Sequence, residues 1–351
     1  MIKNKAEDPM PLNIIRDPNI DSLKGFLILS VIIGHWNHSF LESINFDVYY
    51  YHVPMFLGVS LFFIPDFNKH FLLKRMSFLL IPYFLWSISP GLYTILLHPS
   101  TLFADRIINL GNILMGNFHY LKSIIWFLPC LFTANILFSI YKNFKNSFTP
   151  IFITLFIISF FYSDRIAEIH EKGFIPFGID IFIYFFPYFL SLIYVYQKKS
   201  LFKVKQYWIF LFPIILSAFL IFKFEPIKLH TDIHHQIDLA QFSVPTTIVG
   251  YFSMTLLSIS ILILFCNSPS NKILSIFGYY SMPIYFFHLT IMKYVKKLYD
   301  AYIINQNSYS SFLIYLACIL IILFLSILIN NILFKISKYF KYFGIVQTKA
   351  L

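Results

Sequence analysis

The chain has 351 residues, of which 58% are hydrophobic and only 12% are charged, and it carries a formal net charge of +11. Ordinary soluble domains have about 25% charged residues, so this composition excludes a soluble globular protein. We predict a multi-pass helical membrane protein whose lysines flank its helices on the cytoplasmic side. The expected partner is therefore the lipid bilayer, and no nucleic acid is expected.

Neither the cysteines nor the N-terminal segment changes this predicted class of protein. Cys130, Cys266 and Cys318 lie far apart, within or beside apolar segments, with no metal-ligand spacing and no disulfide framework. The first twenty residues are polar, so no cleavable signal peptide is expected and the first apolar segment is predicted to be a membrane helix. No metal site is expected, because a solvated polar loop explains the histidines near residues 230–235.

Breaks at proline, glycine and charged residues divide the apolar sequence into ten predicted spans, each of about 20 residues. The predicted spans are residues 20–41, 49–65, 76–98, 123–141, 148–163, 178–196, 206–223, 244–265, 276–292 and 311–334. With both termini in the cytoplasm, 18 of the 27 Lys and Arg residues fall inside and 11 of the 16 Asp and Glu residues fall outside. This asymmetry is typical of the positive-inside arrangement.

No internal repeat or low-complexity linker divides the apolar region. We predict a cytoplasmic N-terminal segment over residues 1–19, an all-α transmembrane domain over residues 20–334 and a basic cytoplasmic tail over residues 335–351.

The first predicted span carries a line of polar side chains. Asp17-Pro18 is a strong helix start, because an acid cap precedes a proline at the first helical position. Steps of three or four residues place one face of the helix at positions 17, 21, 24, 28, 31, 35, 38 and 42. Ionisable groups at bilayer depth are costly and usually face a functional cavity, so this face is predicted to line one.

Lys24 and His35 are the most informative members of this line. They are eleven residues apart, about three helical turns, so Lys24 is predicted near the cytoplasmic entrance and His35 deep in the membrane on the same face. A neutral imidazole suits proton transfer near neutral pH, and His35 is therefore a candidate catalytic residue. For Asp17, Asp21 and Lys24 the alternative is a role as interfacial anchors.

A second histidine is predicted at similar depth in the ninth span. Ser281, Tyr285 and His288 are spaced four and three residues apart and share one helix face. Counted from a cytoplasmic end near residue 277, His288 lies about 16 Å deep, which predicts that it shares a cavity with His35. The alternative is that the two hydroxyls only join helices by hydrogen bonds.

Basic and aromatic residues near other span ends are further candidates. Lys74 and Arg75 lie on the predicted cytoplasmic side beside a helix end and suit a phosphate contact, although plain anchoring is the alternative. His38 and His52 lie at the predicted outer ends of the first two spans, where they line an entrance or serve as interfacial residues without a role.

The segment from Arg16 to His35 resembles the opening helix of the acyltransferase-3 family, membrane-bound bacterial enzymes that O-acylate surface sugars. It is most similar to the fucose 4-O-acetylase-like branch. That family typically has an arginine, ten residues and then the histidine; here Lys24 holds the arginine position, and lysine makes no bidentate phosphate contact. Four later segments resemble the family in the same order: Tyr51-His52-Val-Pro-Met-Phe56, Lys74-Arg75 with Leu80-Ile-Pro-Tyr83, Trp126-Phe-Leu-Pro129, and Gly278 to His288.

This resemblance implies transfer of an acetyl group from cytoplasmic acetyl-CoA to a hydroxyl of a cell-surface glycan, in the bacterial cytoplasmic (inner) membrane and without a permanently bound cofactor. The acceptor is an O-antigen, capsule or exopolysaccharide sugar. The implied catalytic residues are His35 and His288, the donor-binding residues are Asp21, Lys24, Lys74 and Arg75, and the acceptor-side or supporting residues are His38, His52, Trp126, Ser281 and Tyr285.

Two mechanisms fit these residues: direct attack of the hydroxyl with His35 as general base, and an acetyl-histidine intermediate. The alternative function is a membrane transporter or flippase of a lipid-linked glycan, although paired halves with broken helices are not visible. The acceptor sugar, the length of the acyl group and the oligomeric state stay open.

Overall fold

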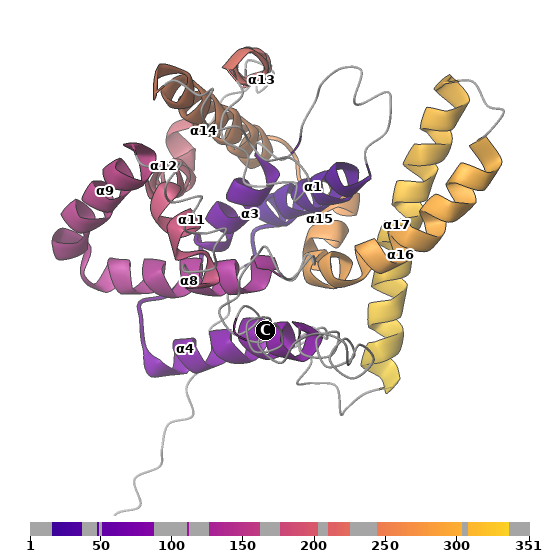
Figure 1. Cartoon of the computed structure of the whole chain (residues 1–351), viewed down its shortest axis with the longest axis horizontal. Helices are drawn as coiled ribbons and strands as arrows, with labels where there is room; N and C mark the ends of the chain where they lie inside the picture. The colour runs from indigo at the N-terminus through magenta and orange to yellow at the C-terminus, as the bar shows by residue number, and fades with distance from the viewer. Residues whose placement is uncertain are drawn as a thin grey trace, which may run out of the picture.

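The computed structural model describes residues 16–36, 48, 51–87, 111, 126–161, 176–202, 210–224, 244–303 and 308–336. These residues are almost entirely helical, and no strand occurs among them (Figure 1). The predicted all-α class is therefore confirmed.

Every one of the ten predicted spans contains helix in the described part of the chain. The α-helices are α1 (Pro18–His35), α3 (His52–Ser60), α4 (Lys69–Arg75), α8 (Phe127–Asn143), α9 (Lys145–Phe161), α11 (Ile179–Tyr184), α12 (Phe186–Gln197), α13 (Leu211–Phe224), α14 (Val244–Asn267), α15 (Lys272–Tyr279), α16 (Ser281–Ile303) and α17 (Ser308–Ile336). A π-helical segment, η2 (Met76–Leu80), joins α4 to helical residues 81–87, and 3-10 turns η4 (Pro176–Gly178) and η5 (Lys199–Phe202) flank α11 and α12.

Among the described residues, two helical stretches are long and apolar enough to cross a membrane by themselves, Ile248–Asn267 and Ser310–Ile332. A third is added if Pro176–Tyr184 and Phe186–Gln197, which meet at 66°, together form one broken span. The count of ten spans therefore stays a prediction.

Several predicted helix boundaries are wrong; the sixth span, 178–196, is broken at Phe185 between α11 and α12, and α3 of the second span, 49–65, ends at Ser60. The first span was expected to run to residue 41, but α1 ends at His35, because Trp36 leaves the helical conformation (φ −121°, ψ 83°). The ninth span was expected as one helix over residues 276–292, but Tyr280 separates α15 from α16, and α16 continues to Ile303. Glu42 and His38, which were expected on the same helix face as His35, lie outside the described residues.

The start of α1 follows the prediction. The Asp17 carboxylate accepts a hydrogen bond from the Asn19 backbone N–H at 3.0 Å, and Pro18 occupies the first helical position. From there α1 crosses two apolar clusters. Its first half adds Ile20, Leu23 and Leu27 to a cluster with α3, α8, α12 and α14. Its second half adds Ile28, Val31, Ile32 and Trp36 to a cluster with α16 and α17, so α1 joins the two parts of the core.

Helices α1 and α15 lie so close together that their backbones are in contact. A Cβ atom added at Gly25 would lie 1.9 Å from the Leu274 carbonyl oxygen, and one added at Gly278 would lie 1.8 Å from the Asp21 carbonyl oxygen. Small residues at a helix crossing allow this approach, which is a common way to pack helices in membranes.

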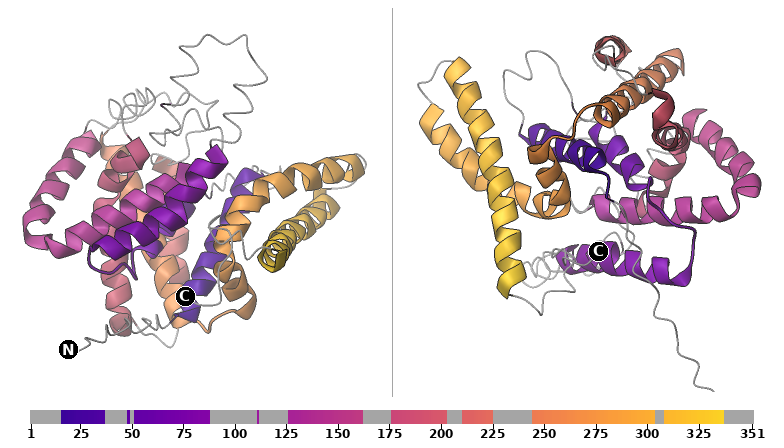
Figure 2. Two further views of the ribbon diagram at one scale, coloured as in Figure 1. Left: turned by 90° about the horizontal axis from the view of Figure 1, so that it is seen from below. Right: turned by 180° about the vertical axis from the view of Figure 1, so that it is seen from behind.

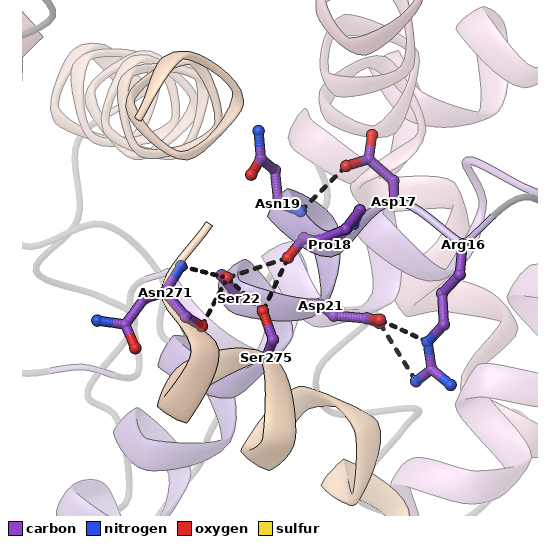
Figure 3. Close-up of polar contacts among 8 residues, drawn as sticks. All are labelled: Arg16, Asp17, Pro18, Asn19, Asp21, Ser22, Asn271 and Ser275. Atoms are coloured by element: carbon purple, nitrogen blue, oxygen red, sulfur yellow. Dashed lines mark hydrogen bonds and ion pairs between the residues drawn. The ribbon is translucent and has the colours of Figure 1, made fainter. Parts of the chain in front are cut away.

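Serine hydroxyls complete the same crossing (Figure 3). The Ser22 hydroxyl lies 2.7 Å from the Ser275 hydroxyl and accepts a hydrogen bond from the Asn271 backbone N–H at 3.1 Å. The Ser275 hydroxyl also donates to the Pro18 carbonyl oxygen at 3.1 Å. These bonds fix the turn before α15 against the first turn of α1.

Segments predicted on the cytoplasmic side meet at one end of the molecule. The Asn19 amide donates to the Cys266 carbonyl oxygen at 3.3 Å, and the rings of Phe62 and Tyr196 stack at 4.4 Å. Near Phe62, Lys142 forms an ion pair with Asp66 at 3.1 Å. These contacts join the start of α1 to the ends of α3, α8, α12 and α14; the alternation of the chain across the membrane stays a prediction.

Asp17 is the centre of this end. Its carboxylate pairs with Lys199 at 2.7 Å and accepts a hydrogen bond from the Tyr196 hydroxyl at 3.0 Å. Burial raises the pKa of Asp17, but Lys199 and the hydrogen bonds from Tyr196 and Asn19 lower it more, so the pKa lies below its ordinary value of 3.8. The charged form of Asp17 therefore stabilises the fold.

Gly25→Ala and Gly278→Ala each place a methyl group against backbone atoms of the opposite helix. We expect each substitution to destabilise the protein by about 1–3 kcal/mol or more, because backbone at a crossing has little room to move. Thermal melting of the purified protein in detergent measures this. Gly111→Ala is the control, since a Cβ there meets no heavy atom within 4 Å. Unchanged melting of Gly25→Ala would show that the two helices lie farther apart.

Asp17→Asn keeps a good helix cap and removes the charge. At neutral pH we expect a loss of about 0.5–1 kcal/mol, because the ion pair is only partly buried. A carboxylate whose pKa is lowered by folding stabilises above its unfolded pKa, and this stabilisation is lost as the pH falls through the lowered value. Melting temperatures of wild type and variant should thus differ at about pH 7 and converge below about pH 4.

The control for this series is Asp66→Asn, because the Asp66 side chain is 74% exposed and its pair with Lys142 should contribute little. A difference between wild type and Asp17→Asn that stays constant down to about pH 3 would contradict the ion-pair assignment.

Candidate functional site

Two histidines from opposite ends of the chain meet beside the end of α1. The His35 and His288 rings lie 5.3 Å apart between centroids and are tilted by 38°. His288 is completely buried on α16, and His35, the last residue of α1, is half-buried. The structure thus brings together the two residues that were expected to share one site.

The hydrogen bonds of His288 define its tautomer. Its Nδ1 atom lies 2.8 Å from the Tyr285 carbonyl oxygen and 3.1 Å from the Ile284 carbonyl oxygen. Carbonyl oxygens only accept, so Nδ1 carries the proton and Nε2 of the neutral ring carries a lone pair. Nε2 has no hydrogen-bond partner among the described residues. A buried imidazole nitrogen in this state is suited to accept a proton or to attack an electrophile.

Trp36 holds the end of α1 in place. The Tyr315 hydroxyl of α17 donates a hydrogen bond to the Trp36 carbonyl oxygen at 2.9 Å. The Trp36 ring is buried and packs edge-on against Tyr299 at 5.1 Å and against Tyr315 at 5.3 Å. Because Trp36 directly follows His35, these contacts restrict the position of the His35 imidazole.

Charged residues gather on α1 toward its N-terminal end, which is predicted to be cytoplasmic. The half-buried Lys24 side chain feels the attraction of Asp21 and the repulsion of Arg16 and Arg75. Asp21 is buried and is held by Arg16, whose Nη2 lies 3.4 Å from Oδ1 and whose Nε donates to Oδ2 (Figure 3). The Arg16 guanidinium also stacks on the Tyr279 ring at 4.1 Å.

We call Arg16, Lys24 and Arg75 the cationic cluster. Asp21 is the acid that pairs with Arg16 and attracts Lys24. Arg75 lies over the Phe71 ring at 5.2 Å, and burial lowers the pKa of its guanidinium from the ordinary value. Arginine stays charged at neutral pH even so. The cluster therefore has an excess of positive charge and can bind phosphate groups.

Arg16 is the member of the cationic cluster that the sequence reading missed. From the sequence it is one of the predicted cytoplasmic basic residues and the first residue of the segment that resembles the acyltransferase-3 family, with no role in the site. The signal was its position directly before the capping Asp17 and five residues before Asp21. At this spacing the long Arg16 side chain can reach forward to the Asp21 carboxylate.

Lys74 was expected beside Arg75 as a phosphate ligand. Of these two neighbours, Arg75 is the one whose charge reaches Lys24. The Lys74 carbonyl oxygen accepts a hydrogen bond from the Ser77 hydroxyl at 2.8 Å, and its side chain is half-buried.

Of the supporting candidates, Tyr285 lies against His288. Phe127, next to Trp126, packs against Tyr285 at 5.6 Å, and Tyr285 packs against His288 at 6.2 Å. Ser281 begins α16 on the same face as Tyr285 and His288. Trp126 itself is buried, with its ring edge-on to Phe127 at 6.1 Å.

His52 has a core position rather than an exposed one. It is 1% exposed, and its Nδ1 lies 2.7 Å from the Val48 carbonyl oxygen. Its neighbour Tyr51 shares a hydrogen bond of 2.9 Å with the Ser30 hydroxyl of α1. His38 lies outside the described residues. In the described part of the chain, no group of three or more His, Cys, Asp or Glu side chains is arranged to hold a metal ion.

Comparison with protein families decides the class of this protein. Residues 17–331 match the acyltransferase-3 family, described as an acyltransferase domain. The chain belongs to the acyltransferase-3 family. Searches of curated proteins and of solved structures found no match. Because acyltransferase-3 proteins are membrane acyltransferases, this chain is a membrane protein and an acyltransferase.

The acyltransferase-3 match begins at the cap of α1 and ends within α17. Both histidines therefore lie inside it, together with Lys24 and Arg75, and Arg16 directly precedes it. The individual roles of these residues, and the division of the chain at residues 19 and 334, stay predictions.

Tyr315→Phe tests how Trp36 positions His35. The substitution keeps the ring packing and removes the hydroxyl that holds the Trp36 carbonyl oxygen. We expect acyl-transfer turnover to fall about tenfold, because small displacements of reacting groups are costly. The Michaelis constant for the acyl donor should stay the same, since Lys24 lies about 16 Å away along α1.

Steady-state kinetics on purified protein measure both quantities. Tyr294→Phe is the matched control, because Tyr294 is 63% exposed on α16. Equal turnover for wild type and Tyr315→Phe would remove the positioning role of this hydrogen bond.

Proposed function

We propose that this acyltransferase moves an acetyl group from cytoplasmic acetyl-CoA to a hydroxyl of a cell-surface glycan, in the cytoplasmic membrane of a bacterium. The acceptor is a sugar of an O-antigen, a capsule or an exopolysaccharide. The observation that carries this proposal is the histidine pair, in which the buried Nε2 of His288 presents a lone pair next to the ring of His35.

The two ends of α1 have different roles in this proposal: one binds the donor, and the other carries the catalytic histidine. The cationic cluster of Arg16, Lys24 and Arg75 lies toward the predicted cytoplasmic side and suits the phosphates of coenzyme A. The pantetheine arm then runs along α1 toward the histidines, which are eleven residues beyond Lys24. Positive charge at the mouth also raises the local concentration of an anionic donor.

The histidine pair supplies the chemistry. The acceptor hydroxyl oxygen forms a bond to the thioester carbonyl carbon while its proton passes to His35 as general base. The imidazolium formed at His35 is stabilised by donating a hydrogen bond to Nε2 of His288. The carbon–sulfur bond then breaks, and the coenzyme A thiolate leaves and takes up the proton.

An acetyl-histidine intermediate is the variant of this mechanism. In it a ring nitrogen attacks the thioester first and the acceptor hydroxyl then attacks the acetyl-histidine. The variant uses the same two residues and gives the same product, so the proposed function does not depend on the choice. Membership of an acyltransferase family favours both over the transporter or flippase alternative.

NMR of surface polysaccharide tests the proposal in cells. A deletion strain is complemented with wild type, His35→Ala, His288→Ala or His70→Ala, where the exposed His70 of α4 is the control. We expect O-acetyl signals with wild type and His70→Ala, and a loss of about 100-fold or more with His35→Ala, because general bases contribute that much. His288→Ala should also reduce the signal.

The protein must be present in the membrane at equal amount in each strain, which a tagged immunoblot measures. O-acetyl signals that stay the same in the deletion strain would refute glycan acetylation. Signals retained by both histidine variants would refute the site. Loss of the glycan itself from the deletion strain would favour the flippase.

A further inference from the structure

The second half of α16 presents a row of lysines. Lys293, Lys296 and Lys297 are all exposed, and their spacing of three and four residues places them on adjoining positions of one helix face. We call them the lysine face. The opposite side of the helix packs into the core through Ile291, Met292 and Val295. The lysine face is therefore held by a packed helix and points away from its core contacts.

The lysine face carries a net positive charge. None of them forms an ion pair with any described residue, although Asp300 follows three positions after Lys297. Like charges at this spacing destabilise a helix by a few tenths of a kcal/mol per pair. A row of unpaired cations on a packed helix attracts anions, so the lysine face has the charge of an anion-binding surface.

The lysine face lies beyond the histidines. Lys293 follows His288 by five residues and Lys297 by nine, which are about 7 Å and 13 Å along the helix. At the same level Tyr299 of α16 packs against Trp36, directly after the end of α1. The cationic cluster of Arg16, Lys24 and Arg75 lies toward the other end of α1, so the site has separate positive surfaces on its two sides.

The predicted topology places this part of α16 on the outer side of the membrane. Basic residues are depleted from outer segments of membrane proteins, so three of them within five positions call for a reason other than orientation. Figures 1 and 2 show α16 and α17 side by side at one edge of the molecule. The three lysines are exposed on this part of α16.

We propose that the lysine face binds the acceptor and that the acceptor is an anionic glycan, one whose sugars carry carboxylate or phosphate groups. The lysines hold negative groups of the glycan beyond the end of α1 while a hydroxyl of a sugar farther along the glycan chain reaches His35 and His288. This inference rests on the proposed function, because it names the acceptor class of the same site. A neutral glycan makes no use of the lysine face.

Binding of defined glycans tests this without catalysis. The purified full-length protein is placed in nanodiscs of zwitterionic phosphatidylcholine, and fluorescence anisotropy follows a labelled alginate tetrasaccharide, which carries carboxylates, or labelled maltotetraose, which is neutral. We expect alginate to bind more tightly and its binding to weaken with added salt. The triple variant Lys293→Gln, Lys296→Gln, Lys297→Gln should weaken alginate binding about tenfold and leave maltotetraose unaffected.

The matched control replaces three exposed lysines on the predicted cytoplasmic side, Lys69→Gln, Lys145→Gln and Lys272→Gln. Both triple variants must have melting temperatures close to that of wild type. If a triple variant is destabilised, the corresponding single lysine variants are measured instead. Equal alginate affinity for wild type and the lysine-face variant would overturn the inference. So would an effect that appears only when phosphatidylglycerol is added to the nanodisc, because the lysines then bind lipid.

A kinetic arm separates this inference from the proposed function. With glycan from the deletion strain as acceptor, the lysine-face variant should raise the Michaelis constant for the glycan and leave that for acetyl-CoA unchanged. Absence of acetyl transfer in wild type would refute the proposed function alone, because the anisotropy result stands without acetyl-CoA. An unchanged Michaelis constant for the glycan, with transfer intact, would overturn the lysine-face assignment.

Discussion

The contact of α1 with α15 is the constraint on which the rest of the site depends. Gly25 and Gly278 let the two backbones touch, and the Ser22 and Ser275 hydroxyls fix the register of the contact. Since α16 begins directly after α15, this register determines where His288 meets α1. The same contact carries Tyr279 under the Arg16 guanidinium. One helix crossing thus places both the cationic cluster and the histidine pair.

The type of ionisable side chain changes along α1, from charged residues near its start to an imidazole at its end. This is the order that the cost of burying charge in a membrane favours. Cations are least costly near the membrane surface, where long side chains reach water and phosphate. Deep in the molecule the ionisable groups are imidazoles, which are neutral in their resting state and cost far less to bury. Direct hydrogen bonds to backbone carbonyls hold His288 in one tautomer without any buried charge. In the proposed function, an acyl-CoA whose anionic phosphates bind at one end can therefore react at a neutral site at the other.

Patterns of residues close together in the sequence predicted the features that depend only on those residues. The Asp17-Pro18 start, the spacing of Lys24 and His35 on one face, and the common face of Ser281, Tyr285 and His288 all follow from helix periodicity. The end of α1 does not follow from helix periodicity, because the sequence after His35 is as compatible with helix as the sequence before it. Trp36 leaves the helix where Tyr299 and Tyr315 receive its ring and Tyr315 binds its carbonyl oxygen. These partners lie more than 260 residues away in sequence.

By itself, then, the amino-acid sequence determined the membrane class, the helical content and the residues that form the polar face of α1. It also predicted similar depths for His35 and His288, because depth is a count of residues along a helix. Only the tertiary structure decided that Arg16 holds Asp21, that Arg75 rather than Lys74 acts on Lys24, and that His52 is buried. Helix periodicity is a property of adjacent residues, whereas these pairings depend on which faces of distant helices pack against each other.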